Sequence, residues 1–223
     1  NNQVRNVPSW TWKLSRLTTL NVEGNPLESP PDKILERGTK AVLAYLQLMD
    51  RSRVSNRLEL DSLAIDALPV ELGQLPTLTS LSMTKNEIRE LDPDVLRQLT
   101  NLKTLSVAHN KLTDAHHVLG RLTNMTSLDL SHNMIKQLPV TIGEIRSLTM
   151  LNVQRNELEM LPPHLGNLNL LREMKIDHNP LLAPPPEVIA GKTTAILEYL
   201  RRFSEANRSG VLKLVGMQLS SIP

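Results

Sequence analysis

The 223-residue sequence predicts an α/β fold in which a row of repeats shares one open parallel β-sheet. Two observations support this fold class. A motif of the form LxxLxLxxNxLxxLP recurs along most of the chain, with Asn110 and Asn133 at the same motif position 23 residues apart. The same enlargement then interrupts the repeat twice, at positions that differ by 154 residues. The chain is therefore expected to be a single solenoid over residues 1–223.

The LxL centre of each repeat predicts a short β-strand. Alternate side chains of a strand face opposite sides, so the two leucines of residues 128–130 are expected to face the core. One strand of this length cannot bury its apolar side alone. We therefore expect the copies to stack side by side about 4.8 Å apart, in a parallel sheet on the concave side of the solenoid.

An asparagine follows each predicted strand, where the chain turns out of the sheet. A carboxamide has both a donor and an acceptor, so it can bond otherwise unpaired backbone groups of its own turn and of the neighbouring turn. This pattern predicts a structural ladder formed by Asn25, Asn86, Asn110, Asn133, Asn156 and Asn179.

The two enlargements predict helical insertions on the convex side, at about residues 28–54 and 182–208. Asn25 lies 38 residues before its equivalent Leu63, and Asn179 lies 38 residues before Met217, where one repeat takes 23. Prolines at the start favour an extended entry, and the apolar residues that follow have helical spacing. Gly38 divides the first insertion, which favours two short helical pieces over one.

Leu63 and Met217 occupy the asparagine position of the repeats that follow the insertions. An apolar side chain cannot bond the turn backbone, and a lost buried partner costs about 1–3 kcal/mol. Our hypothesis is that each insertion and its following repeat form a seam at which the curvature of the solenoid changes.

Residues 191–194 read GKTT, which is how a nucleotide-binding P-loop ends. A P-loop also needs a glycine five residues before Gly191, and that position is Pro186, which has no N–H. The 154-residue offset aligns GKTT with RGTK of the first insertion. The stretch therefore predicts a helix start and not a phosphate site.

Composition excludes several function classes. The chain has 25 Lys and Arg against 23 Asp and Glu, a balance that does not favour nucleic acid or an anionic membrane as partner. Aromatic residues make up 2%, cysteine is absent, and no apolar run is long enough for a membrane span. We expect no metal, no cofactor, no nucleic acid and no membrane insertion, a cytoplasmic location, and a natural protein longer than this chain.

Longer stretches of the sequence resemble a known family. LPVTIGEIRSLTMLNVQRN and LPPHLGNLNLLREMKIDHN resemble the Ras-group branch of cytoplasmic leucine-rich-repeat proteins, and NPLESPPDKILERGTKAVLAYL resembles a helical segment of Roco-type proteins. The second copy departs from that segment at AGKTT. The repeat resemblance covers essentially the whole chain, and it implies a leucine-rich-repeat solenoid (horseshoe) that binds proteins.

The predicted partner-binding surface is the concave face, where the residues beside each LxL leucine point outward. Small hydroxyl residues occupy these positions in the middle repeats, which would leave a shallow trough, although a merely solvated face fits the same pattern. The candidate residues are Arg57, Glu59, Ser82, Lys85, Ser106, His109, Asp129, His132, Asn152, Arg155, Lys175 and His178.

Stacked turns would place His109 and His132 side by side, about 5 Å apart. The pair is open to four interpretations: ordinary half-exposed turn residues, part of a cationic ladder for an acidic partner, a pH-sensitive edge, or a metal site that lacks an evident third ligand. Asp129, Ser131 and His132 do not predict a hydrolase, because strand geometry separates Asp129 and Ser131 by about 7 Å and an open sheet does not exclude water. No catalytic residue is expected.

Trp10 and Trp12 lie close together near the start of the chain. One is expected to fill a gap on the convex side, and the other is a candidate contact for a partner if it is exposed. The function predicted from all these observations is a non-enzymatic scaffold that binds another protein, whose identity the sequence does not give. The alternative is a regulatory repeat region of a larger Roco-type GTPase–kinase, with catalysis outside this chain.

Overall fold

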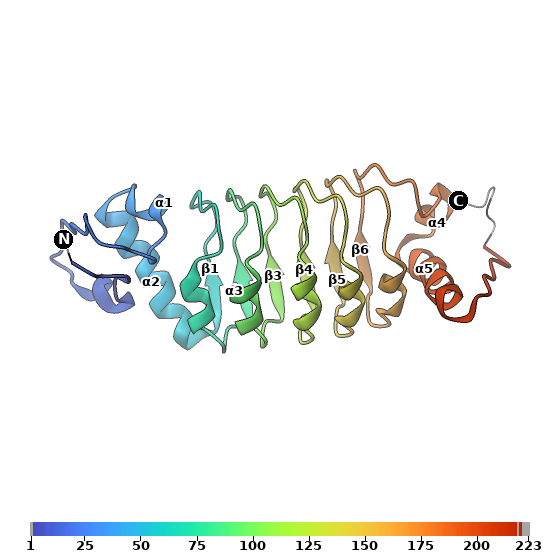
Figure 1. Ribbon diagram of the computed structural model, residues 1–223, viewed down its shortest axis with the longest axis horizontal. Helices are drawn as coiled ribbons and strands as arrows, with labels where there is room; N and C mark the ends of the chain where they lie inside the picture. The colour runs from blue at the N-terminus through green and yellow to red at the C-terminus, as the bar shows by residue number, and fades with distance from the viewer. Residues whose placement is uncertain (1, 218, 220–223) are drawn as a thin grey trace.

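The computed structural model describes residues 2–217 and 219, and Figure 1 shows them as a row of repeats between two pairs of helices. Six strands form one open parallel sheet whose order in space is their order in sequence. This arrangement confirms the predicted solenoid. The strands are Arg57–Glu59 (β1), Ser80–Ser82 (β2), Thr104–Ser106 (β3), Ser127–Asp129 (β4), Met150–Asn152 (β5) and Glu173–Lys175 (β6).

The register of the sheet stacks equivalent residues of the repeats on one another. Leu81 pairs with Leu105 and Leu105 with Leu128, so the central residue of each strand belongs to one buried column. The residues on either side of it lie on the opposite side of the sheet and are exposed or half-buried in most strands. That side is the predicted concave face.

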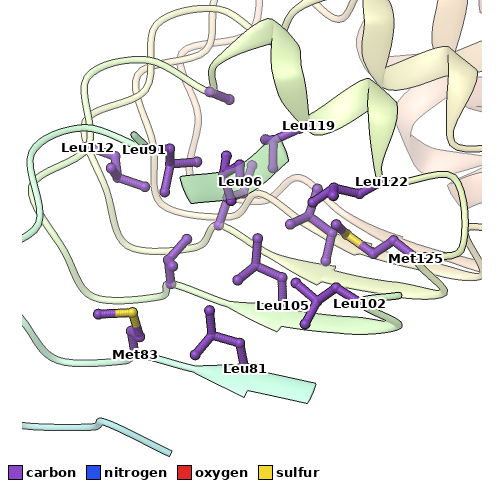
Figure 2. Close-up of a cluster of buried hydrophobic side chains, with 14 of the residues drawn as sticks. Leu81, Met83, Leu91, Leu96, Leu102, Leu105, Leu112, Leu119, Leu122 and Met125 are labelled. Carbon is purple, nitrogen blue, oxygen red and sulfur yellow. The ribbon is translucent and has the colours of Figure 1, made fainter. Parts of the chain in front are cut away.

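The core lies between the sheet and a row of short helices on the convex side. Figure 2 shows Leu105 of β3 close to Leu96 and Leu102 of the convex side, and all three side chains are at most 1% exposed. The convex elements are the 3-10 helices Ser9–Lys13 (η1), Val70–Gln74 (η2), His117–Arg121 (η3), Val140–Glu144 (η4) and Pro163–Asn167 (η5), and the α-helix Pro93–Gln98 (α3).

Glycine sets the close spacing of these convex helices. A Cβ atom on Gly120 would lie 2.4 Å from the carbonyl oxygen of Thr141 in the next repeat, and one on Gly143 would lie 2.3 Å from that of His164. Gly166 of η5 has the same crowding, but its neighbour is the backbone of Arg201, which belongs to the second insertion. The helix of the insertion therefore occupies the place that the convex helix of a next repeat would take.

Each insertion forms two helices, as the position of Gly38 suggested. The first contains Asp32–Leu35 (α1) and Thr39–Ser55 (α2), and the second contains Pro186–Ala190 (α4) and Lys192–Ser209 (α5). Gly38 has φ 83°, and its equivalent Lys192 has φ 59°. The second insertion thus keeps a left-handed residue at this turn, although its glycine lies one position earlier.

Equivalent threonines at the starts of α2 and α5 accept hydrogen bonds from the repeats that precede the insertions. The backbone N–H of Leu20 donates to Thr39 Oγ1 at 2.9 Å, and the N–H of Met174 in β6 donates to Thr193 Oγ1 at 3.0 Å. In both places a hydroxyl oxygen takes the position of the carbonyl that a next strand would supply. Thr193 belongs to the GKTT stretch, so that stretch has a structural role at the edge of the sheet.

The prediction that all repeats extend one sheet is therefore wrong for the first repeat and for the last. The stretch around Leu20 and the described stretch around Leu212, which both have the LxL pattern, form no strand of the described sheet. The reason at the first repeat is that α2 packs against β1, so β1 has no strand partner on that side among the described residues. The predicted change of curvature at Leu63 stays a prediction.

A buried carboxylate joins the first insertion to the repeat that follows it. Glu71 of η2 is 6% exposed, and its Oε1 accepts a hydrogen bond from Ser29 Oγ at 2.5 Å and another from the hydroxyl of Tyr45 in α2. Burial raises the pKa of the Tyr45 hydroxyl, and the adjacent charge and hydrogen bond of Glu71 raise it further. Tyr45 therefore stays a neutral donor.

The buried asparagines join each turn to the preceding repeat. Asn133 Nδ2 donates to the carbonyl oxygens of Leu130 at 2.9 Å and Ser131 at 3.2 Å in its own turn, and to that of Val107 at 3.0 Å in the repeat before. Its Oδ1 accepts from the N–H of Leu112, which lies 21 residues earlier, at 3.0 Å. One carboxamide thus satisfies groups of two repeats.

The other five asparagines of the predicted ladder also accept from an N–H 21 or 22 residues earlier. This rule explains why Leu63 needs no asparagine. In the other repeats this N–H lies two positions after the preceding asparagine position, and for Leu63 the equivalent residue is Leu27, whose N–H already donates to the carbonyl oxygen of Asn25. The backbone N–H of Leu63 is satisfied by the following repeat, because it donates to Asn86 Oδ1 at 3.0 Å.

We expect Asn133→Ala to lower the free energy of unfolding by about 1–3 kcal/mol, because buried backbone groups lose their partner. Urea denaturation measures this change. Asn167→Ala, at an exposed position of η5, is the matched control and should have little effect. Leu63→Asn should not stabilise the protein, since the equivalent Leu27 N–H already bonds Asn25, and a gain in stability from Leu63→Asn would contradict the bonding rule.

We expect Thr193→Val to lower stability by about 1 kcal/mol and to speed hydrogen exchange at the Met174 amide, because the isosteric side chain accepts no hydrogen bond. Thr193→Ser keeps the hydroxyl and should behave like the unchanged protein. Thr194→Val, at the exposed neighbouring position, is the control. Unchanged exchange at Met174 in Thr193→Val would show that the hydroxyl does not close the sheet.

Candidate functional site

Two columns of side chains cover the concave face, because the strands are in register. In the middle repeats the residues are small and hydroxylic, and in the outer repeats they are charged or larger. The first column contains Arg57, Ser80, Thr104, Ser127, Met150 and Glu173, and the second contains Glu59, Ser82, Ser106, Asp129, Asn152 and Lys175. The structure thus brings together the seven strand residues of the predicted binding surface.

Several of these polar groups bond one another across the face. Asp129 Oδ1 accepts from the Ser131 N–H at 2.9 Å, and its Oδ2 accepts from Asn152 Nδ2 at 3.1 Å. Lys175 and Glu173 form an ion pair of 3.1 Å between half-exposed side chains. Asn152 is only 7% exposed, so it is the least accessible of the predicted binding residues.

The other predicted binding residues occupy the turn after each strand, directly before the asparagine. We call Lys85, His109, His132, Arg155 and His178 the turn column. All five have a left-handed backbone, with φ between 53° and 58°. The identical backbone directs their side chains out of successive turns in the same way, so they form a row beside the concave face.

The left-handed conformation of the turn column was not predicted. A signal for it is present in the sequence, because glycine occupies the same position at Gly24 (φ 70°) and Gly216 (φ 78°). Glycine adopts positive φ without steric cost, whereas other L-residues do not. A position that alternates between glycine and long side chains in equivalent repeats therefore indicates a left-handed turn.

Two imidazoles of the turn column stack on each other. The ring centroids of His109 and His132 lie 3.8 Å apart with an interplanar angle of 19°. Burial lowers the pKa of His132 below its ordinary value of 6.5, and the neighbouring His109 and Arg155 lower it further, while Asp129 acts in the opposite direction. His132 therefore favours the neutral form in the folded protein.

This arrangement offers little for catalysis or metal binding. Among the described residues, no group of three or more His, Cys, Asp or Glu side chains could hold a metal ion. Ser131 is 3% exposed, and its backbone N–H bonds Asp129, so the two residues form a turn and not a nucleophile–base pair. None of the helices in residues 2–217 is long and apolar enough to cross a membrane.

The two tryptophans have different environments, as predicted. Trp12 is half-buried, and its Nε1 donates to Asp50 Oδ2 at 2.9 Å, which fastens η1 to α2. Trp10 is 55% exposed. Only Trp10 is available to a partner, and it lies on the convex side, away from the sheet.

Comparisons with known proteins agree with this architecture. The leucine rich repeat family model matches residues 56–112 and 100–158. A solved leucine-rich-repeat protein of Leptospira interrogans is 28% identical, with a TM-score of 0.58, over 82% of this chain and 43% of that one. An internalin of Listeria monocytogenes is also 28% identical, with a TM-score of 0.53, over 60% of this chain and 38% of that one.

One curated protein is similar to a shorter stretch. The probable inactive serine/threonine-protein kinase roco10 of Dictyostelium discoideum is 31% identical over 81 residues, which are 34% of this chain and 3% of that protein. The chain therefore spans less than half the length of each of these three relatives.

We expect His132 to titrate below 6.5 in the folded protein and Arg155→Gln to raise its pKa, because the change removes a neighbouring cation. NMR titration of the imidazole resonances measures both. Since the folded pKa lies below the unfolded one, the stabilising contribution of neutral His132 is complete above about pH 6.5 and declines as the pH falls below it. Lys136→Gln, at an exposed loop position, is the control. A pKa at or above 6.5 would contradict the prediction.

Proposed function

We propose, from the leucine-rich repeats that build this chain, that it is a non-enzymatic scaffold that binds another protein on its concave face. The observation that supports the proposal most is the open, registered sheet with small hydroxyl residues in its middle. A rigid surface of this kind presents equivalent positions at intervals of about 4.8 Å, so a partner can contact several repeats together. We place this activity in the cytoplasm.

The accessible groups of this face suit recognition better than chemistry. Ser82 and Ser106 lie next to each other in the register and are half-buried, which leaves room for a partner to approach the backbone of the sheet. Charged residues lie at both ends of the trough, Arg57 and Glu59 on β1 and Lys175 on β6. They would orient a partner along the solenoid, because complementary charges determine register and association rate.

The second candidate is a regulatory repeat region of a larger Roco-type signalling enzyme, with catalysis outside this chain. The similarity to the Dictyostelium roco10 protein supports it, although it covers 34% of this chain. The two insertions within one array also resemble leucine-rich-repeat-containing protein forty, which favours the scaffold. The full-length reading frame distinguishes the two, since a GTPase or kinase segment in it would favour the regulatory region.

Affinity capture with charge-altered variants tests the proposed function. Arg57→Glu, Ser82→Arg, Asp129→Lys and Lys175→Glu change the concave face, and Arg121→Glu and Glu144→Lys change exposed convex positions. We expect one partner, identified by quantitative mass spectrometry, to be recovered about tenfold less with at least two concave variants and normally with both convex variants. Equal recovery with all four concave variants would exclude this face as the binding surface.

A further inference from the structure

We infer that the turn column binds an acidic, extended segment of the partner, and that this binding strengthens when His132 takes up a proton. The inference rests on the proposed function, because it gives the chemistry of the segment that the scaffold recognises. Three features of the turn column support it: its backbone conformation, its charge distribution and its spacing.

The backbone conformation of the turn column favours glycine, yet five successive turns have none there. A left-handed residue other than glycine costs about 1–2 kcal/mol relative to the right-handed form, and asparagine, aspartate and histidine tolerate it best after glycine. The chain has Lys, His, His, Arg and His instead, all with φ between 53° and 58°. Lys85 and Arg155 are kept against the local preference, which indicates that their side chains serve a purpose.

The charged side chains of the column itself are positive, and Asp129 is the carboxylate that acts on its middle, at His132. Lys85 and Arg155 are exposed cations on either side of the stacked imidazoles. The adjoining column towards the sheet has no charged residue in these four repeats, since it consists of Thr84, Ala108, Ser131 and Gln154. On the other side Glu87 is already paired with Lys111, at 2.8 Å.

The spacing of the column fits an extended peptide. Lys85 and Arg155 are three repeats apart, which is about 14 Å at about 4.8 Å per strand. An extended chain covers this distance with about five residues at about 3.3 Å each, and its alternate side chains face the same side. A segment with acidic residues at alternate positions would place two or three carboxylates over the column.

The histidine pair makes such binding depend on pH. His132 faces His109, Arg155, Asp129 and His178. Burial disfavours its protonation in the free protein, as do His109, Arg155 and His178, while Asp129 favours it. A carboxylate bound above His132 would favour its protonated form, because an opposite charge within about 4–6 Å raises the pKa of a base. By linkage, the acidic segment then binds more tightly as the pH falls from 7.5 to 5.5.

Fluorescence anisotropy tests the inference with a labelled nine-residue peptide in which Glu alternates with Ser, and with its Gln counterpart. Low ionic strength keeps the interaction measurable, and Glu stays ionised at pH 5.5. We expect the Glu peptide to bind about tenfold more tightly at pH 5.5 than at 7.5, and the Gln peptide to bind at least tenfold more weakly at both. Equal binding of the two peptides would overturn the inference.

Glycine variants separate recognition from folding, because glycine suits the left-handed turn. Lys85→Gly with Arg155→Gly should weaken binding of the Glu peptide about tenfold at both pH values. His109→Gly with His132→Gly should remove the pH dependence and leave binding at pH 7.5 nearly unchanged. Both double variants should keep a normal thermal unfolding midpoint. The control that removes two cations elsewhere, Arg121→Gln with Lys136→Gln, should bind like the unchanged protein.

The failures of the two proposals have different signatures. If the captured partner is lost with the concave-face variants and retained with both glycine double variants, the scaffold stands and the acidic-segment inference is wrong. If the control double variant loses peptide binding as much as Lys85→Gly with Arg155→Gly, the attraction is a general effect of net charge and the inference is also wrong. If the amount of partner recovered is the same with every concave-face variant as with the unchanged protein, the proposed function itself is wrong.

Discussion

The buried asparagine carboxamide is the interaction on which the rest of this structure depends. Each repeat alone is a three-residue strand, a turn and a short helix, which is too little to form a core. The amide of Asn133 bonds the end of its own strand and two backbone groups of the repeat before it. Because it does so out of water, each turn has one shape and one distance from its neighbour. The register of the leucine column and of the concave face follows from that repeated geometry.

The same bonding pattern explains where the sheet ends. An asparagine is useful only if the preceding repeat offers an unpaired N–H two positions after its own asparagine, and before Leu63 that N–H belongs to Leu27 and already bonds the carbonyl oxygen of Asn25. The position of Leu63 is therefore free to be apolar. The repeat before each insertion still has an outward N–H, and the hydroxyl of Thr39 or Thr193 accepts a hydrogen bond from it. The second insertion thus ends the sheet at β6 without leaving that amide of the edge unpaired.

The turn shape also connects the fold to the candidate site. A left-handed residue before each asparagine lets the chain leave the strand at the same angle in every repeat. Its side chain then has one direction, which is why His109 and His132 stack face to face. The neutral state of His132 is a consequence of that crowding together with Arg155. The electrostatic properties of the turn column are therefore produced by the packing of repeats and not by any one residue.

The sequence by itself determined the solenoid, the parallel order of its strands, the two divided insertions and the residues of the concave face. It could do so because each depends on local periodicity, which repeats visibly every 23 residues and, for the insertions, at an offset of 154. Only the tertiary structure decided that Leu20 lies outside the sheet, that Glu71 accepts hydrogen bonds from Ser29 and Tyr45, and that Thr193 accepts one from the edge strand β6. These contacts join residues that no period relates, and they form because a buried polar group must find a partner wherever the packing brings one.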